Sequence, residues 1–420
     1  INLAFSNMEF DNACMKRHTT TLLHELLGLF PCVALVGVRQ CGKTTLLKEL
    51  PPDWRIFDLE KLADRDQVGR DPDLFLRLNA HHVAIDESQL LPELFPALRV
   101  AIDSQREVPG RFVITGSSSP ELLSAISESL AGRIAIIEMA PFSLAEAYEL
   151  PPAHLYEGLA ARASLVDLLQ LQPRLTPGQC ADYWLNGGYP EPWIKNTARF
   201  RKLWMQNYLQ TYLERDLPRL FPGLDRQKFR LFVQMLAQLS GSIINYSEVA
   251  RALGVSQPTA RDYFQIAHGT FVWRHLPAYE QNATKRVVKH PKGYLRDSGL
   301  LHDLLHLQGR DDLLAHPRMG ASWEGMVIET LLRGFAAAGI GCRPFHYRTG
   351  GGAEIDLVLE GDFGVIPVEI KHTQHVDVRS LRALRDFVAE RGCRYGIVIN
   401  NDEQPRLLDE RLIAIPLAVL

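Results

Sequence analysis

The sequence predicts an α/β protein of several domains, built around a parallel sheet in its N-terminal third. Apolar, β-prone segments alternate with helix-forming segments between residues 16 and 150, a pattern typical of parallel strands joined by helices. Polar residues directly follow these strand candidates, at the carboxyl ends where parallel sheets bind ligands. A mainly helical region comes next, and a second α/β pattern begins near residue 320.

The composition is that of an ordinary globular protein. The 420 residues are 46% hydrophobic and 23% charged, enough chain for about two to four domains. The net charge of −3 excludes a global attraction to nucleic acid, so such a site must be a local basic patch. No apolar run approaches the roughly 18 residues of a membrane span, and we recognise no signal peptide. Six scattered cysteines without a C-x-x-C pair argue against zinc and disulfides and predict a cytoplasmic protein.

The first strand candidate leads into a phosphate-binding motif. The segment CVALV is followed by GVRQCGKT at residues 37–44, which matches G-x-x-x-x-G-K-[ST] at every fixed position. The two glycines allow successive N–H groups to turn inward, and the next helix adds the positive end of its dipole. We therefore expect ATP and Mg²⁺ to bind here, with Lys43 on the β- and γ-phosphates and the Thr44 hydroxyl on the metal. The expected nucleotide contacts are Gly37, Val38, Arg39, Gln40, Cys41, Gly42, Lys43, Thr44 and Thr45.

The strand candidate at residues 82–86 ends in two acidic residues. An apolar strand of this kind places Asp86 at its tip, where the carboxylate can hold Mg²⁺ directly or through water. Glu87, one residue on, is expected to polarise the water that attacks the γ-phosphate. Acidic residues after a strand are common by chance, but these follow a complete phosphate-binding motif.

Two further segments each have two interpretations. Thr115 ends the strand candidate at residues 111–115 and Ser117 follows it; these side chains can sense the γ-phosphate, or the segment caps a helix at Ser119. Arg133 is either the basic neighbour of a glycine helix cap or an arginine finger that acts on a neighbouring subunit's ATP. The second interpretation of Arg133 predicts a homo-oligomer.

The chain carries, in this order, GVRQCGKT, AIDESQ, ITGSSS, LAGR and, at residues 186–192, NGGYPEP. This series resembles a large prokaryotic family of AAA+-type ATPases with a C-terminal domain of unknown function that has a restriction-endonuclease-like fold. The resemblance runs from about Arg17 to near the C-terminus. It implies an AAA+-like sheet in which the strand of Thr115 lies between the strands of the phosphate-binding motif and of Asp86. Cys41 departs from the family, where small or β-branched residues are more usual, and it offers an oxidisable thiol at the nucleotide.

We expect four domains, of which the ATPase domain spans residues 16–150. Residues 151–240 are mainly helical by pattern; residues 200–217, for example, carry apolar side chains at helical spacing. We interpret this second domain as a helical lid that packs against the ATPase domain.

Residues 241–296 carry a helix-turn-helix pattern. Ser247 and Ser256 are the expected N-caps of two short helices, and Gly254 forms the turn between them. On the second helix, side chains that face outward are placed as those of a DNA recognition helix. These are Gln257, Thr259 and Arg261.

Strand candidates at residues 271–276 and 287–288 follow, and together with the two helices they predict a winged helix. The second strand candidate has no acidic neighbour and is surrounded by Lys285, Arg286, Lys289, Lys292 and Arg296. Such a basic wing suits contacts to the DNA backbone with little sequence specificity. The alternative is a winged helix used only for packing between proteins.

Residues 297–420 form the fourth expected domain, with helix, three strands, helix and strand in that order. The expected elements are residues 321–338, 343–348, 354–360, 365–371, 379–391 and 395–400. Their order, with acidic residues on the second and third strands, resembles the core of PD-(D/E)xK nucleases.

The resemblance gives four residues a role in this nuclease-like core. Asp356 and Glu369 would bind Mg²⁺ and generate a nucleophilic water, with Glu324 as an additional acid, and Lys371 would stabilise the attacked phosphate. Alternatively, Lys371 or Arg348 balances the acids as a salt bridge, and the domain only docks on DNA.

The pattern as a whole predicts a Mg²⁺-dependent ATPase that couples ATP hydrolysis to binding and remodelling of DNA, as a motor or branch-migration enzyme. Metal-dependent nuclease activity is a further expectation. The rivals are a regulatory NTPase switch and a protein-remodelling ATPase, each with an inert nuclease-like domain. The expected partners are structured or non-sequence-specific DNA and further copies of the chain, and no membrane.

Overall fold

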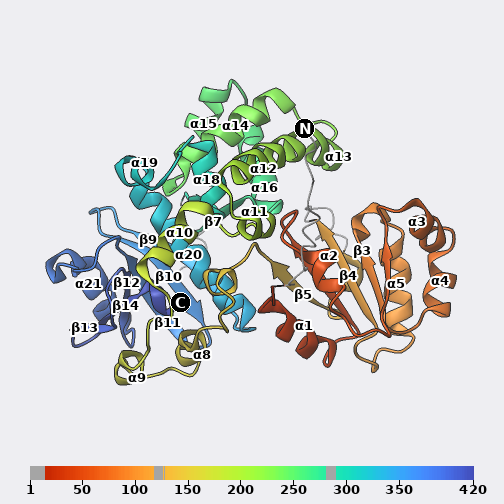
Figure 1. Cartoon of the computed structure of the whole chain (residues 1–420), viewed down its shortest axis with the longest axis horizontal. Coiled ribbons are helices and arrows are strands. Elements are labelled where there is room, and N and C mark those ends of the chain that lie inside the picture. Colours follow the sequence, from red (N-terminus) through yellow and green to blue (C-terminus); the bar gives the residue numbers. More distant parts are fainter. Residues whose placement is uncertain (1–14, 118–125, 127, 281–289) are drawn as a thin grey trace, which may run out of the picture.

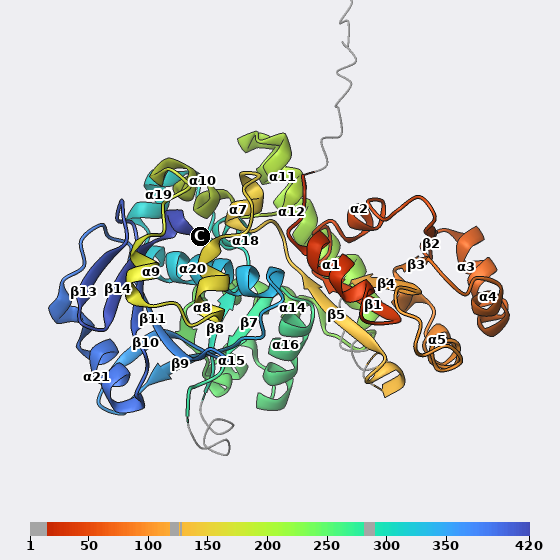
Figure 2. The ribbon, with the colours of Figure 1, turned by 90° about the horizontal axis from the view of Figure 1, so that it is seen from below.

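The computed structural model describes residues 15–117, 126, 128–280 and 290–420. Two α/β units lie toward opposite ends of the long axis, with a group of helices and a small sheet between them (Figures 1 and 2). Among the helices in these residues, none is both long and apolar enough to cross a membrane.

A five-stranded parallel sheet forms the first unit. Its strands are β1 (Cys32–Gly37), β2 (Arg55–Asp58), β3 (Val83–Asp86), β4 (Phe112–Ser117) and β5 (Ile134–Met139). They lie in the order β2-β3-β4-β1-β5, which confirms the position that the family resemblance implied for the strand of Thr115. All six residues of β1 are buried, as expected for a parallel strand covered on both faces. The helices of this unit are α1 (Thr19–Leu27), α2 (Lys43–Leu47), α3 (Leu62–Gly69), α4 (Pro72–Leu78), the 3₁₀ turn η1 (Ser88–Leu90) and α5 (Leu94–Asp103).

A run of helices follows the first sheet. They are α7 (Leu144–Ala147), α8 (His154–Ala160), α9 (Leu165–Leu169), α10 (Pro177–Asn186), α11 (Pro190–Lys195), α12 (Ala198–Thr211) and α14 (Arg226–Leu239). Between the last two, α12 continues without a break into a π-helical turn, η2 (Tyr212–Asp216), and then into α13 (Leu217–Leu220). Short π-helical turns are rare and are frequently found at functional sites.

The middle of the chain pairs two helices with a small antiparallel sheet. The elements are β6 (Ser242–Ile243), α15 (Tyr246–Leu253), α16 (Gln257–Gly269), β7 (Trp273–Leu276) and β8 (Lys292–Leu295), with strand order β6-β8-β7. Gly254 makes the turn in the left-handed conformation, and Ser256 caps α16. The expected cap at Ser247 is wrong, because the side chain of Asn245 caps α15 and accepts from the N–H groups of Ser247 and Glu248. The strand candidate at residues 287–288 lies outside the described residues.

The C-terminal unit has a mixed six-stranded sheet. Its strands are β9 (Arg343–Arg348), β10 (Glu354–Gly361), β11 (Gly364–Ile370), β12 (Gly396–Asn400), β13 (Arg406–Asp409) and β14 (Leu412–Pro416), in the order β13-β14-β12-β11-β10-β9. The sequence predicted the first four strands and missed the last two. The helices are α18 (Ser298–Leu304), α19 (Arg310–Ala315), α20 (Met319–Ala337), η3 (Val378–Leu381), α21 (Arg382–Arg391) and η4 (Leu417–Val419).

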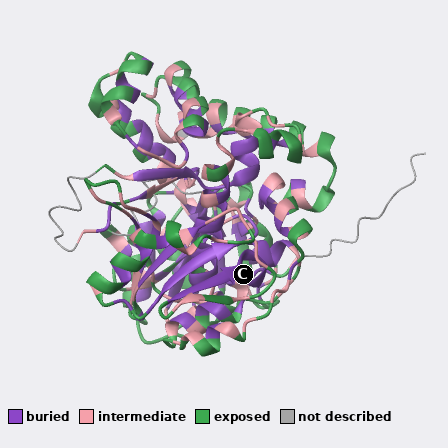
Figure 3. Cartoon of the chain, turned by 90° about the vertical axis from the view of Figure 1, so that its left-hand side faces the viewer, coloured by how far each residue is buried: buried purple, intermediate pink, exposed green. Residues whose placement is uncertain are grey.

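The buried cores do not follow the expected domain boundaries. One core continues from β1 and the phosphate-binding loop through α12 and α14 to α16. Another joins α8 and α10 to α20 and the C-terminal sheet. The strands of this sheet are largely buried, and the helices around them have exposed outer faces (Figure 3). Residues 155–184 therefore pack on the C-terminal unit, although residues 151–240 were expected to pack as one lid on the ATPase domain. Helical spacing indicates that a face is apolar but not which neighbour covers it.

Candidate active site

The phosphate-binding loop joins the end of β1 to the start of α2. Gly42 has a φ of 102°, a left-handed conformation that favours glycine. A Cβ on Gly37 would lie 2.0 Å from the carbonyl oxygen of Met139 on β5, so only glycine fits between the loop and that strand. These two positions allow the tight turn that an anion-binding nest requires.

Lys43 lies against the loop that it follows. Its side chain is buried, and its ammonium donates to the carbonyl oxygens of Gly37 and Val38, each at 3.0 Å. The ammonium is therefore held at the mouth of the nest, close to the position that phosphate oxygens would take.

Two neighbouring strands and the start of α2 bring the next polar groups together. The Thr44 hydroxyl, just inside α2, donates to Asp86 Oδ2 at the end of β3, at 2.6 Å. Thr115 on β4 donates to the other oxygen of Asp86. A hydroxyl and a carboxylate in contact are oxygen ligands of the kind that Mg²⁺ prefers, so Thr44 and Asp86 fit the expected metal.

Glu87 has a φ of 55°, in the left-handed region. The backbone therefore turns away from the direction of β3 at this residue. Its N–H faces Asp86 Oδ1 at 3.1 Å and Thr115 Oγ1 at 3.3 Å, and its carboxylate accepts from the Gln89 amide. Both Glu87 and Gln89 line a cavity of about 90 Å³ beside the loop. Left-handed backbone at a non-glycine residue is uncommon and is concentrated at functional sites.

The far wall of this cavity comes from a segment that sequence reasoning did not connect with the nucleotide. Arg39 of the loop forms an ion pair with Asp216 of η2. Tyr212 of the same turn and Thr270, directly after α16, line the same cavity. Asp216 lies 177 positions from Arg39, and no local pattern signals such a pair.

Other residues predicted at the nucleotide have different surroundings. Cys41, which we expected to offer an oxidisable thiol at the nucleotide, is fully buried. The loop turns this side chain into the core, beside Tyr189 and Tyr208. Gln40 and Thr45 are exposed, and Val38 is buried.

Thr115 is buried and engaged with Asp86 rather than open to the cavity. The Ser117 side chain lies outside the described residues. Arg133 precedes β5 at the amino-terminal edge of the sheet, opposite the loop, and forms two hydrogen bonds with Asp103, at 2.7 and 3.0 Å. Its role as an arginine finger, and the homo-oligomer that this role requires, stay predictions.

The acids of the C-terminal unit lie close enough to influence one another. Burial, followed by the nearby Asp356 carboxylate, raises the pKa of Glu324 and of Glu369 to about 7. Glu369 accepts from Lys371 at 2.6 Å, and Asp356 accepts from the N–H of Ile370 at 2.8 Å. The sequence thus placed Glu324, Asp356, Glu369 and Lys371 correctly near one another.

A lysine that was expected elsewhere enters this acidic cluster. Lys292, on β8, donates to Glu324 at 2.7 Å and to Glu354 at 2.9 Å. Within the described parts of the chain, no three His, Cys, Asp or Glu side chains form a group that could hold a metal ion. The structure therefore shows Lys292 and Lys371 paired with three of these acids, whereas the nuclease resemblance implied a metal.

The structure describes only some of the residues that we expected to contact DNA. Gln257 and Arg261 are exposed on α16, and the guanidinium of Arg261 lies over the ring of Tyr246, 5.2 Å from its centroid. Thr259 is half-buried, with its hydroxyl 2.8 Å from that of Ser256. Lys285, Arg286 and Lys289 lie outside the described residues.

Two members of the expected basic wing are in the wrong place for DNA. Lys292 and Arg296 are buried, because each is drawn into ion pairs with acids of the neighbouring units. Arg296 pairs with Glu138 and, at 3.2 Å, with Glu329.

Three stretches of the chain match known families. Residues 30–148 match the AAA domain, and residues 178–311 and 319–420 match the domains of unknown function DUF8612 and DUF4143. Among solved structures, the Walker-type ATPase PABY2304 of Pyrococcus abyssi aligns with 70% of this chain and 96% of its own, at 16% identity and a TM-score of 0.42.

The nest, the contact between Thr44 and Asp86, and the matched AAA domain together define the class: an AAA-type P-loop ATPase, an ATP-hydrolysing enzyme. The chain belongs to the same family as the uncharacterized proteins Rv2008c of Mycobacterium tuberculosis and Mb2031c of Mycobacterium bovis. Each is 34% identical over 414 residues, which cover 96% of this chain and 85% of the relative.

Proposed function

We propose that the chain couples Mg²⁺-dependent ATP hydrolysis to the binding and remodelling of DNA. The observation that carries this proposal is a continuous set of contacts from the nucleotide loop to the end of α16. Arg39 pairs with Asp216 of η2, and the Tyr212 hydroxyl of the same turn lies 2.7 Å from that of Thr270, which follows α16 directly. A phosphate that draws Arg39 away from Asp216 would release η2 and with it the end of α16.

Hydrolysis would use groups that already lie together at the sheet edge. Lys43 would exchange its two loop carbonyls for β- and γ-phosphate oxygens. Thr44 and Asp86 would hold Mg²⁺, and the bound ion would supply positive charge to the phosphates. Thr115 keeps the Asp86 carboxylate oriented through its hydroxyl, and Glu87 orients the attacking water and accepts its proton.

The DNA-binding part of the proposal rests on α15, α16 and the β6-β8-β7 sheet, which we interpret as a winged helix. Gln257 and Arg261 are exposed at the start of α16, where a recognition helix contacts DNA. Lys285, Arg286 and Lys289 follow β7 in the sequence and would supply backbone contacts.

ATPase assays with and without single-stranded, duplex and branched DNA test the coupling. We expect DNA to stimulate turnover in the wild type. Changing Lys285, Arg286 and Lys289 together to Ala should weaken binding to all sequences and flatten its salt dependence by up to about 0.9 for each phosphate that the protein no longer neutralises. Arg77→Ala, which removes an exposed arginine on α4 of the ATPase unit, is the control and should leave binding unchanged. Turnover that no DNA stimulates would favour the regulatory switch or the protein-remodelling ATPase instead.

We further propose that the C-terminal unit docks on DNA without cutting it. The support is that lysines of the chain itself form ion pairs with these acids. Lys292 in particular lies between Glu324 and Glu354 and pairs with both. Supercoiled plasmid incubated with the wild type in Mg²⁺ or Mn²⁺ should therefore stay intact. Nicking by the wild type that disappears in Asp356→Asn would instead establish the nuclease.

A further inference from the structure

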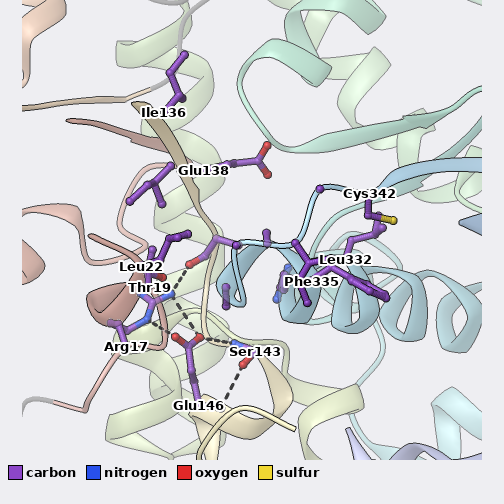
Figure 4. A pocket seen from close by; sticks show the side chains of 18 of the residues that line it. Arg17, Thr19, Leu22, Ile136, Glu138, Ser143, Glu146, Leu332, Phe335 and Cys342 are labelled. Carbon is purple, nitrogen blue, oxygen red and sulfur yellow. Dashed lines mark hydrogen bonds and ion pairs between the residues drawn. The ribbon is translucent and has the colours of Figure 1, made fainter. Parts of the chain in front are cut away.

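A buried arginine lies directly behind the phosphate-binding loop. Arg17 precedes α1, and its side chain is only 7% exposed. Nη1 donates to the carbonyl oxygen of Cys41 in the loop at 2.6 Å, and Nη2 donates to that of Ala140 at 2.7 Å. Nε donates to Glu146 of α7 at 3.0 Å. Figure 4 shows Arg17 and Glu146 pointing toward each other at the edge of a cavity of about 430 Å³.

The hydrogen bond to the Cys41 carbonyl oxygen also fixes the orientation of the N–H group that follows it. In a planar trans peptide, the C=O of one residue and the N–H of the next point in opposite directions. Holding the Cys41 oxygen toward Arg17 therefore directs the Gly42 N–H away from Arg17. A Cβ on Gly42 would already lie 3.4 Å from Arg17 Nη1, so the guanidinium packs closely against this peptide.

Arg17 itself is held rigidly. Glu146 is buried and also accepts from the N–H groups of His18 and Ser143, each at 2.8 Å. Burial opposes ionisation of Glu146, but the Arg17 charge and these hydrogen bonds hold its pKa below the ordinary value, so the pair stays ionised. The planar guanidinium reaches three acceptors in fixed directions, which the single ammonium of a lysine does not reproduce.

We propose that Arg17 is a positioning residue for phosphate binding: it orients the peptide between Cys41 and Gly42 so that the Gly42 N–H points into the nest. This inference rests on the proposed ATPase function and adds a residue that touches no phosphate. Because Arg17 orients a hydrogen-bond donor of the nest, we expect it to affect the affinity for the phosphate chain rather than the rate of the chemical step.

Arg17→Lys is the test, with the dissociation constants of ATP and of tripolyphosphate, kcat, KM and Tm as the measurements. We expect both dissociation constants and the KM for ATP to rise about tenfold or more, as for the loss of one buried charged hydrogen bond. The kcat at saturating ATP should stay within about threefold of wild type, since bound nucleotide restores the loop.

The matched control is Arg111→Lys. Arg111 is also buried and also donates to main-chain carbonyls, those of Ala80 and Ala101, but it precedes β4 at the opposite edge of the same sheet. This variant should lose thermal stability without a change in affinity. Glu146→Gln is the second variant; it leaves Arg17 in place, weakens its anchor, and should raise the dissociation constants in the same direction by a smaller factor.

The outcomes separate this inference from the function on which it rests. Wild-type protein that binds and hydrolyses ATP, with unchanged dissociation constants in folded Arg17→Lys and in Glu146→Gln, would overturn the role of Arg17 alone. Weakened ATP binding with unchanged tripolyphosphate binding would also overturn it, because the nest would then be intact. A wild type that neither binds nor hydrolyses ATP would overturn the proposed function itself.

Discussion

Lys43→Ala is expected to abolish tight binding of ATP, and Glu87→Gln is expected to bind ATP but hydrolyse it about 100-fold or more slowly. The Lys43 ammonium lies at the mouth of the nest, so its loss removes the cation that faces the phosphates. Gln at position 87 keeps the size of the side chain but cannot accept a proton. Nucleotide titration by calorimetry and a phosphate-release assay measure the two effects separately.

Exposed residues of the same kind in the same unit provide the controls. Lys48 follows α2 directly and Glu93 precedes α5, and both side chains are exposed. Lys48→Ala and Glu93→Gln should bind and hydrolyse ATP as the wild type does. Wild-type turnover in Glu87→Gln would remove this carboxylate from the mechanism, and tight ATP binding by Lys43→Ala would contradict the assignment of the loop.

Glu329→Gln is expected to lower the free energy of unfolding by about 3–5 kcal/mol, because it removes the carboxylate charge that buried Arg296 and Arg333 share. Glu329 lies on α20 with a side chain only 3% exposed. It forms ion pairs with Arg274 and, at 3.2 and 3.7 Å, with Arg296 and Arg333. Thermal unfolding should show a fall in Tm on the order of 10 °C.

The same ion pairs predict a dependence of stability on pH. Burial alone would raise the pKa of Glu329, but the arginines, Arg274 first, hold it at about 2, against an ordinary value of 4.5. A lowered pKa contributes stability that is present above the ordinary value and is lost as the pH falls toward about 2. The wild type should therefore lose stability across this window, and Glu329→Gln should lose less.

Asp386→Asn is the control for both measurements, because Asp386 pairs with Arg382 on the exposed face of α21. Exposed pairs contribute about 0–1 kcal/mol, so the Tm should hardly change. An equal and small change in Tm for Glu329→Gln and Asp386→Asn would show that the buried ion pairs do not stabilise the fold.

The sequence determined the ATPase sheet because its signals are local. The motif at residues 37–44 requires glycines where the chain turns sharply, and Asp86 and Glu87 directly follow an apolar strand. Alternation of strands and helices then gives parallel strands, whose carboxyl ends meet at one edge. The gathering of Lys43, Thr44 and Asp86 at that edge follows from these local patterns alone.

The sequence was less informative where a helix has two possible neighbours. Residues 155–184 and 200–217 both carry apolar faces at helical spacing, yet the first stretch packs on the C-terminal sheet and the second on the ATPase unit. From the sequence, we assigned Lys292 and Arg296 to a basic wing, since a run of cations without acids is typical of a solvated surface. Their acidic partners lie on other elements, too far away in the sequence for a local pattern to predict the ion pairs.

Only the tertiary structure decided which charges meet. Arg17 and Glu146 are 129 positions apart, Arg39 and Asp216 are 177 apart, and Lys292 and Glu354 are 62 apart. A buried ion pair is favourable only when packing brings both partners to one place and excludes water there. That condition depends on how the units dock rather than on residue type or spacing. The sequence therefore specified the nucleotide loop, while docking of the units specified what holds the loop from behind and what fills the acidic cluster.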